Sequence, residues 1–210
     1  MINSKKELAF YLMADRIMSG YPENLSLSQW VIFHLKRALG GCILTSYLYA
    51  LRKTAYYANC KGTNSISFMF WNNQLRKAGI KFGFSIGYNS LGYGCVIPHW
   101  GTIVVNQNSR IGNFAVLQTS TCVAGGDKII GEGLYLATGS QIVGPLKLGD
   151  NVTIASHSMV NKSFGDNILL VGSPAYVKQE KRDAWYVGED FEEKVLRIKE
   201  LRKKWFCDEQ

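Results

Sequence analysis

Aliphatic residues return every six positions through the middle of the chain, with two short insertions between residues 91 and 160. A period of six matches neither the 3.6 of a helix nor the 2 of a half-buried strand. It therefore indicates an internal repeat of small structural units. The repeating residues are Leu91, Ile97, Ile103, Ile111, Leu117, Val123, Ile130, Leu136, Ile142, Leu148, Ile154 and Val160.

Three hexads would form one coil of a triangular prism, in which each hexad supplies a short strand and a corner. The aliphatic residue would point into the prism. The fourth position after it is often small, as expected for a second side chain that faces a narrow interior. These small residues are Cys95, Ala115, Thr121, Ser140 and Ser158.

The pattern resembles the hexapeptide repeat of left-handed parallel β-helix acyltransferases. Within them it is similar to the serine acetyltransferase-like branch, which includes capsular and exopolysaccharide O-acetyltransferases. The resemblance covers about residues 80–177 and is closest in Ile97-Pro-His-Trp-Gly-Thr-Ile-Val-Val-Asn106. Val171-Gly-Ser-Pro-Ala175 resembles the terminal V-x-G-x-P-A segment of the family. The resemblance, and not the period, implies the left-handed coil, because left-handed crossovers are rare.

Helical patterns flank this mainly β region. One helix is expected from Lys5 to Met18, and a second, interrupted one runs from the Ser26-Leu-Ser28 cap signal towards Ala58. Two further helices are expected from Phe68 to Lys77 and from Asp190 to Phe206. The chain thus divides into an α-helical N-terminal region (1–79), a β-helix acyltransferase domain (80–178) and a C-terminal helical extension (179–210). Residues 42–57 are too short and too charged to span a bilayer. We expect them to pack on neighbouring helices or a subunit, and peripheral membrane association stays open.

The 210-residue chain is 47% hydrophobic, enough for a core, and its formal net charge is +8. Its basic residues are spread over both ends and no RNA-binding motif is present, so nucleic acid is not an expected partner. Cofactor phosphates, an anionic glycan or a membrane surface remain as anionic partners.

The five cysteines form an odd set without metal-ligand spacing, and no signal peptide opens the chain, so a cytoplasmic location is expected. Cys95 occupies a small inward position and is expected in the core rather than as a nucleophile. Cys122 is left unassigned. The cysteines are Cys42, Cys60, Cys95, Cys122 and Cys207.

Counting each corner from its aliphatic residue predicts a column of small polar residues below an imidazole and an indole. Neighbouring strands are about 4.8 Å apart, so the column would run about 14 Å and would suit an extended pantetheine arm. Its two histidines would lie three coils apart, too far to share a metal, and a zinc site is not expected. The predicted pairs, in order, are His99-Trp100, Thr119-Ser120, Thr138-Gly139 and Ser156-His157.

His99 is the candidate catalytic base. It lies in His99-Trp-Gly-Thr-Ile-Val-Val105, which matches the family's H-x-G-x-I-V-I stretch, and the resemblance implies that it accepts a proton from the acceptor hydroxyl. His34, inside a predicted helix, is expected to be structural. His157 is expected to line the cofactor end of the groove.

The resemblance also implies acetyl-CoA as co-substrate and a homotrimer with active sites between neighbouring prisms. Family contacts to acetyl-CoA fall on positions that match Ala124, Gly125, Thr138 and Ser156. Lys162 and Lys178, near the end of the prism, are candidate donors to the nucleotide phosphates, with solvated surface lysines as the alternative.

The chain departs from the serine-specific pattern in two places. The serine enzymes carry an acidic residue that partners the catalytic His, and here Pro98 precedes His99 and the upstream position is Phe84 or Ser85. The loop that carries Asp-Arg-His-Pro in those enzymes reads Gly125-Gly-Asp-Lys-Ile129 here. Lys128 is only a point charge and would grip a carboxylate less well than Arg.

These departures favour a saccharide acceptor. Trp100 offers a face for a sugar ring, or equally packing at a subunit contact, and Asp127 could accept hydrogen bonds from sugar hydroxyls. The sequence therefore predicts an acetyl-CoA-dependent O-acetyltransferase of capsular or exopolysaccharide biosynthesis. Serine O-acetylation, N-acylation of an amino sugar and a non-catalytic scaffold remain as alternatives.

Overall fold

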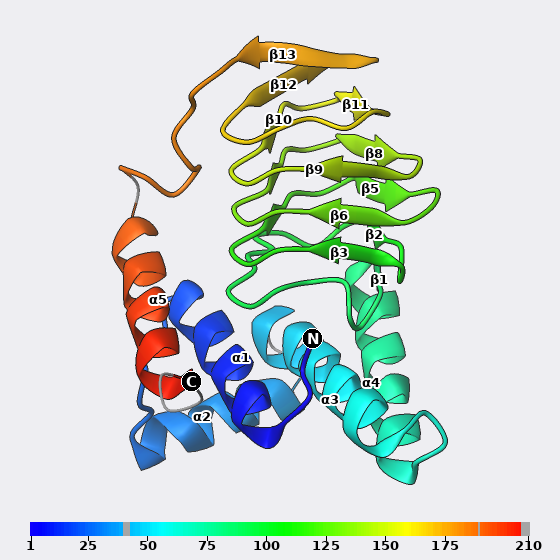
Figure 1. The fold of residues 1–210 in the computed structure, drawn as a ribbon. Coiled ribbons are helices and arrows are strands. Elements are labelled where there is room, and N and C mark those ends of the chain that lie inside the picture. Colours follow the sequence, from blue (N-terminus) through cyan, green and yellow to red (C-terminus); the bar gives the residue numbers. More distant parts are fainter. Residues whose placement is uncertain (40–42, 189, 207–210) are drawn as a thin grey trace.

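A prism of short strands stands on a base of helices in the computed structural model, which describes residues 1–39, 43–188 and 190–206 (Figure 1). The strands stack in parallel coils from β1, next to the helices, to β13 at the far end. The C-terminal helix α5 returns beside α1, so both ends of the described chain lie near the helical base.

The helical elements agree with the sequence patterns in approximate position, although the patterns predict four helical segments and the described residues form five α-helices and one π-helical turn. The first helix has the predicted bounds, the second prediction is split by a π-helical turn, and the third is longer at both ends than predicted. The predicted segment between the second helix and that turn includes residues 40–42, which lie outside the described residues. The helices are α1 (Lys5–Met18), α2 (Leu27–Ala38), η1 (Leu44–Leu48), α3 (Tyr49–Lys61), α4 (Ile66–Phe82) and α5 (Glu192–Phe206).

The strands form three sheets, one for each face of the prism. The first is β1 (Phe84–Ile86), β2 (Ile103–Val105), β5 (Thr121–Ala124), β8 (Gln141–Val143) and β11 (Met159–Val160). The second is β4 (Val116–Leu117), β7 (Tyr135–Leu136), β10 (Thr153–Ile154), β12 (Leu169–Gly172) and β13 (Ala175–Gln179). The third is β3 (Ser109–Ile111), β6 (Lys128–Ile130) and β9 (Leu146–Leu148). All neighbours pair in parallel except β12 and β13, which form an antiparallel hairpin from the predicted terminal segment.

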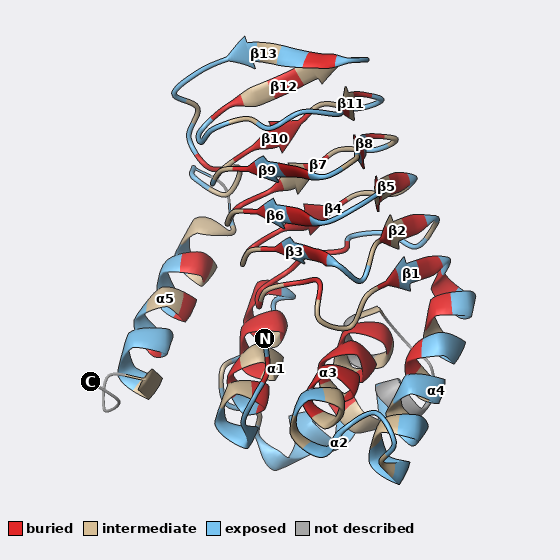
Figure 2. Cartoon of the chain, turned by 45° about the vertical axis from the view of Figure 1, so that its right-hand side comes forward, coloured by how far each residue is buried: buried red, intermediate tan, exposed pale blue. Residues whose placement is uncertain are grey.

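The six-residue repeat fills the interior of the prism, as predicted. Every one of its aliphatic residues is buried, and so are the small residues at the fourth position, including Cys95 (Figure 2). Because side chains alternate between the two faces of a strand, each small residue and the aliphatic residue two positions after it both point inward, and together they form a continuous core.

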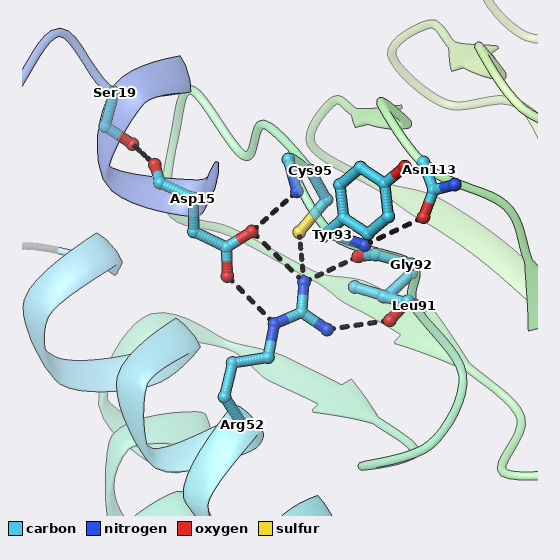
Figure 3. Close-up of polar contacts among 9 residues, drawn as sticks. Asp15, Ser19, Arg52, Leu91, Gly92, Tyr93, Cys95 and Asn113 are labelled. Atoms are coloured by element: carbon cyan, nitrogen blue, oxygen red, sulfur yellow. Dashed lines mark hydrogen bonds and ion pairs between the residues drawn. The ribbon is translucent and has the colours of Figure 1, made fainter. Parts of the chain in front are cut away.

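Helices α1 and α3 are fastened to the first coil by a buried ion pair (Figure 3). Arg52 Nε donates to Asp15 at 2.8 Å, and its other nitrogens donate to the carbonyls of Leu91 at 2.7 Å and Gly92 at 2.6 Å. Asp15 also accepts from the Gly94 backbone N–H at 2.8 Å. Arg52, which lies in the segment 42–57 that is too charged to span a bilayer, is therefore a buried link between helix and prism.

Helix α5 packs against both α1 and the prism. Val195, Ile198 and Leu201 are buried in a cluster that includes Phe10 of α1 and Phe114 of the second coil. The helix predicted from Asp190 to Phe206 is thus present over Glu192–Phe206, and it packs on its own chain.

Candidate active site

His99 lies on an exposed corner between two buried aliphatic residues, Ile97 and Ile103. Pro98 and Trp100 beside it are also exposed, and the Trp100 side chain is 75% accessible. The imidazole makes no hydrogen bond or ion pair with other residues of the described chain. The corner thus presents a histidine and an indole to solvent from an anchored backbone.

The corner is anchored by the junction between α4 and β1. Gly101 donates its N–H to the Phe82 carbonyl at 2.9 Å, and Ile103 donates to the Gly83 carbonyl at 3.1 Å. Gly83 caps α4 in the left-handed region, at φ 83°. A Cβ added at Gly83 would lie 2.8 Å from the Gly101 carbonyl oxygen, so glycine is required for this close approach.

The register of this corner differs from the prediction. Val96 pairs with Val116, 20 positions later, whereas Ile103 pairs with Thr121, 18 positions later, so the His99 corner holds two more residues than the corner above it. Gly101, not His99 or Trp100, lies against Thr119: a Cβ on Gly101 would be 3.2 Å from Thr119 Cγ2. The predicted stacking of His99-Trp100 over Thr119-Ser120 is therefore wrong, and both side chains belong to an outward bulge.

The rest of the predicted column is confirmed. Gly139 donates to the Thr119 carbonyl at 3.1 Å, and His157 donates to the Thr138 carbonyl at 3.0 Å. A Cβ on Gly139 would lie 2.5 Å from His157 Nδ1, so the His157 imidazole covers that glycine. We call this series of corners, from His99 through Thr138 to Ser156 and His157, the His99 edge.

The His99 edge carries backbone donors that a bound amide-containing arm would need. In the described chain, the N–H groups of Thr138 and Ser156 have no backbone acceptor, and both residues are exposed. They stand on successive coils, because β7 pairs with β10 in a register that joins Leu136 to Ile154. An extended chain of amides fits this spacing, since neighbouring strands repeat at about 4.8 Å.

The other candidate residues occupy a second edge. Ala124 ends β5, and Gly125 and Asp127 lie in the exposed loop that follows it, while Lys162 lies in the corresponding corner after β11. His99 precedes β2 and Asp127 follows β5, so these two residues lie at opposite ends of one sheet. We call the second series the Gly125 edge. Lys178 is exposed on β13.

Lys128 is part of the loop's own structure. Its side chain is 1% accessible, and Nζ donates to the carbonyls of Ala124 at 2.6 Å, Gly125 at 3.2 Å and Gly126 at 3.1 Å. Burial lowers the pKa of this ammonium. An ammonium held by three carbonyls of its own loop is not presented to a substrate carboxylate.

The other candidate side chains fall outside these edges or inside the core. Cys95 is fully buried, and burial together with the nearby Asp15 raises the pKa of its thiol to about 12, so it is unsuited to nucleophilic attack. Cys122 is half-buried on β5. His34 packs against Trp30, Phe33 and Tyr49 in the helical region. Of the two upstream positions, Phe84 is buried and Ser85 is exposed.

The structural roles of two residues of the site, Gly83 and Lys128, were not identified from the sequence. The support of the corner by Gly83 has a local signal, because a glycine after an apolar helical segment is typical of a helix C-cap. The burial of Lys128 has none, since a lysine in a Gly-Gly-Asp-Lys loop is typical of an exposed turn. In the described residues, no cluster of three or more His, Cys, Asp or Glu side chains suits a metal ion.

This architecture matches the parallel β-helix that the hexads predict and whose left hand the family resemblance implies, and comparison with solved structures supports the assignment. A serine acetyltransferase solved in complex with CoA covers 81% of this chain and 67% of its own, with a TM-score of 0.58 and 22% identity. Serine acetyltransferase from Brucella abortus strain S19 covers 83% of this chain and 69% of its own, with a TM-score of 0.62 and 22% identity. At these identities the likeness concerns the fold.

Sequence relatives point to the same group. A serine acetyltransferase of Staphylococcus epidermidis is 30% identical over 108 residues, which are 48% of this chain and 49% of that protein. A serine acetyltransferase of Staphylococcus xylosus is 26% identical over 121 residues, which are 51% of this chain and 55% of that protein. The chain spans about half the length of the curated relatives it matches. No family model matches the sequence.

Proposed function

We propose that the protein transfers an acetyl group from acetyl-CoA to a hydroxyl, with His99 as general base. The observation that carries this proposal is the exposed His99 on an anchored corner, at one end of an edge with free N–H donors on successive coils. The names of the sequence relatives, and the CoA complex of one structural neighbour, support the same chemistry.

In the proposed reaction, His99 takes the proton of the acceptor hydroxyl as its oxygen attacks the thioester carbonyl carbon. A carbon–oxygen bond forms and the carbon–sulfur bond breaks. The sulfur leaves as CoA thiolate and receives the proton from the imidazolium, which restores neutral His99. Backbone N–H groups near the carbonyl would stabilise the negative charge on its oxygen before the carbon–sulfur bond breaks.

Acetyl-CoA binding would use both edges of the prism. Thr138 and Ser156 would donate backbone N–H groups to the pantetheine amides, and Ala124 and Gly125 would contribute from the Gly125 edge. Lys162 and Lys178 would meet the phosphates as exposed cations. Because the two edges lie at opposite ends of one sheet, a homotrimer that sets the His99 edge of one chain against the Gly125 edge of the next would complete the site.

Serine is the first candidate acceptor. The relatives matched over about half of their length are named serine acetyltransferases, and so are the structural neighbours. A serine site in this chain would need a cation other than Lys128 for the carboxylate, because the Lys128 ammonium is engaged by its own loop.

A saccharide is the second candidate acceptor, and the engaged Lys128 is the observation that favours it. A sugar hydroxyl needs no carboxylate clamp. Trp100, with 75% of its side chain accessible beside His99, offers a stacking face, and the exposed Asp127 carboxylate could accept from hydroxyls. A glycan of a capsular or exopolysaccharide pathway would then be the acceptor.

The test is CoA release from acetyl-CoA with serine, amino sugars or oligosaccharides. His99→Ala should lower kcat/KM at least about 100-fold. His157→Ala, which removes an exposed imidazole from the same edge, should mainly raise the KM for acetyl-CoA. Serine turnover supports the first candidate, an ester on a saccharide supports the second, and an amide product indicates an amino-sugar N-acyltransferase. No CoA binding and no turnover would indicate a scaffold and overturn the proposal.

The two-edge arrangement has its own test. His99→Ala and Asp127→Ala proteins are purified separately, mixed, unfolded and refolded together. If each site takes one edge from each of two chains, some mixed sites carry neither substitution and activity returns. If one chain supplies the whole site, the mixture stays no more active than the sum of the two variants.

A further inference from the structure

Helix α2 exposes an unusually apolar surface. Phe33 is its buried anchor, with its ring 5.5 Å from that of Tyr21, whereas most of its other large apolar side chains face solvent. In both views α2 lies at the end of the molecule farthest from β13, and it is largely exposed (Figures 1 and 2). The exposed apolar residues on and just after α2 are Leu27, Trp30, Val31, Ile32, Leu35 and Leu39.

The first turns of α4 expose further apolar side chains at the same end of the molecule. The connection between α3 and α4 reaches the same end of the molecule as α2 (Figure 1). Ile66, Met69 and Phe70 begin α4 and are exposed. Exposed apolar side chains on two helices at one end are more than the single scattered residues common on soluble proteins.

The same segment carries cations and no anions. From Asn24 to Gly126 the sequence contains no Asp or Glu. Arg52 is neutralised by Asp15 inside the protein, but most of the other basic residues of α2 to α4 keep their charge near the surface. The exposed basic residues are Lys36, Lys61, Arg76, Lys77 and Lys81.

A groove between α3 and α4 is lined by both apolar and basic side chains. Its volume is about 410 Å³, and its lining includes Tyr49, Phe70, Trp71, Lys77 and Lys81. Aromatic side chains with lysines around them suit the interface between lipid tails and anionic headgroups, where indole rings lie at headgroup depth.

We propose that the helical base, comprising α2, the exposed side of α4 and the groove between α3 and α4, docks on an anionic lipid surface. The exposed apolar side chains would enter the headgroup boundary while the lysines meet lipid phosphates. A second copy of the chain suits this face less well, because pairing two acid-free basic surfaces brings like charges together. No helix among the described residues is long and apolar enough to cross a membrane, and docking at the interface needs none.

The experiment is co-sedimentation of the full chain with phosphatidylcholine vesicles that contain about 30% phosphatidylserine, without acetyl-CoA, so that its result is independent of catalysis. Leu35→Ser and the pair Lys77→Gln with Lys81→Gln should each weaken binding at least about tenfold. Leu196→Ser on α5 is the matched control, since Leu196 is 55% accessible and Leu35 is 56%. Lys147→Gln with Lys203→Gln is the charge control, because both lysines are exposed on other elements.

We expect vesicle binding to require phosphatidylserine and to weaken as the salt concentration is raised from about 0.05 M to about 0.5 M. Both control variants should bind as well as the wild type. Equal binding by every variant, binding to pure phosphatidylcholine alone, or no sedimentation would overturn it. A fall in solution mass of Leu35→Ser without lipid, combined with no vesicle binding, would assign the surface to a second copy instead. Circular dichroism and the unfolding midpoint confirm that each variant is folded.

Discussion

Asp15 and Arg52 form a buried ion pair that joins two helices to the first coil of the prism, with Arg52 Nε 2.8 Å from Asp15 Oδ2 and both side chains almost inaccessible (Figure 3). The guanidinium also bonds the carbonyls of Leu91 and Gly92, and the carboxylate bonds the Gly94 N–H. These contacts end the β stack at the helical base, where its backbone groups would otherwise lack partners.

Replacing Arg52 with Met keeps an apolar stem but leaves the Asp15 carboxylate buried without its cation. Breaking one side of a buried pair costs about 3–5 kcal/mol of unfolding free energy. Urea unfolding measures this loss. Arg76→Met, at an exposed position of α4, is the control and should change stability by less than about 0.5 kcal/mol. A loss for Arg52→Met below about 1 kcal/mol would contradict the role of the pair.

Gly83 and Gly62 give a matched test of how the His99 corner is held. Both have φ near 80°, so alanine costs backbone strain at either position. Only at Gly83 would the new Cβ meet the Gly101 backbone, while nothing lies within 4 Å at Gly62. Gly83→Ala should therefore speed hydrogen exchange in residues 99–103 and lower acetyl transfer at least about tenfold.

Gly62→Ala should leave both the exchange rates of residues 99–103 and the transfer rate almost unchanged, although it also loses stability, because Gly62 at φ 80° and ψ 156° lies in a region essentially restricted to glycine. Equal exchange in the two variants would mean that the corner does not depend on its approach to Gly83.

The sequence predicts the prism well because its signal is local and repeated. Each hexad places one aliphatic residue inward, and twelve agreeing hexads leave little freedom for another fold. The first coil is different: Ile103 and Val105 are both buried and two positions apart, so they share a strand face and either could continue the repeat. The structure places Val105 opposite Val123, and the two extra residues form the His99 bulge.

Long-range partners could not be predicted in the same way. Arg52 lies in a predicted helical segment, and nothing near it in sequence indicates Asp15 of another helix as its partner. Lys128 likewise has the polarity of a loop residue, and its burial depends on how the carbonyls of residues 124–126 turn inward. Asp127 and His99 are separated because they lie at opposite ends of one of the three sheets. A one-dimensional repeat does not specify which corners of the prism come together.

Cys95 should resist alkylation in the folded protein. Its thiol is inaccessible and its pKa is raised to about 12, so little thiolate is present at neutral pH. Iodoacetamide followed by peptide mapping should modify the half-buried Cys60 and Cys122 first and reach Cys95 only in denaturant. Modification of Cys95 at the rate of Cys122 under native conditions would contradict the packing of the first coil.

The same thiol predicts a pH dependence of stability. Because the folded-state pKa is raised above the unfolded value of about 8.5, the folded protein holds the proton more tightly. This contribution is complete below about pH 8.5 and is lost as the pH rises towards 12. Unfolding free energies between about pH 8 and 10 should fall more steeply for wild type than for Cys95→Ala. Parallel slopes would show that Cys95 does not titrate differently in the two states.

Lys128→Met tests whether this lysine holds its loop or binds a substrate. The substitution removes three charge-assisted bonds to the carbonyls of Ala124, Gly125 and Gly126, so stability should fall by about 1.5–3 kcal/mol. Lys147→Met, on the neighbouring β9 with an exposed side chain, should have little effect. A structural lysine should affect the kinetics of serine and sugar acceptors alike, because both depend on the same loop. A rise in KM for serine alone, with stability unchanged, would instead show that the ammonium leaves its carbonyls to bind a carboxylate.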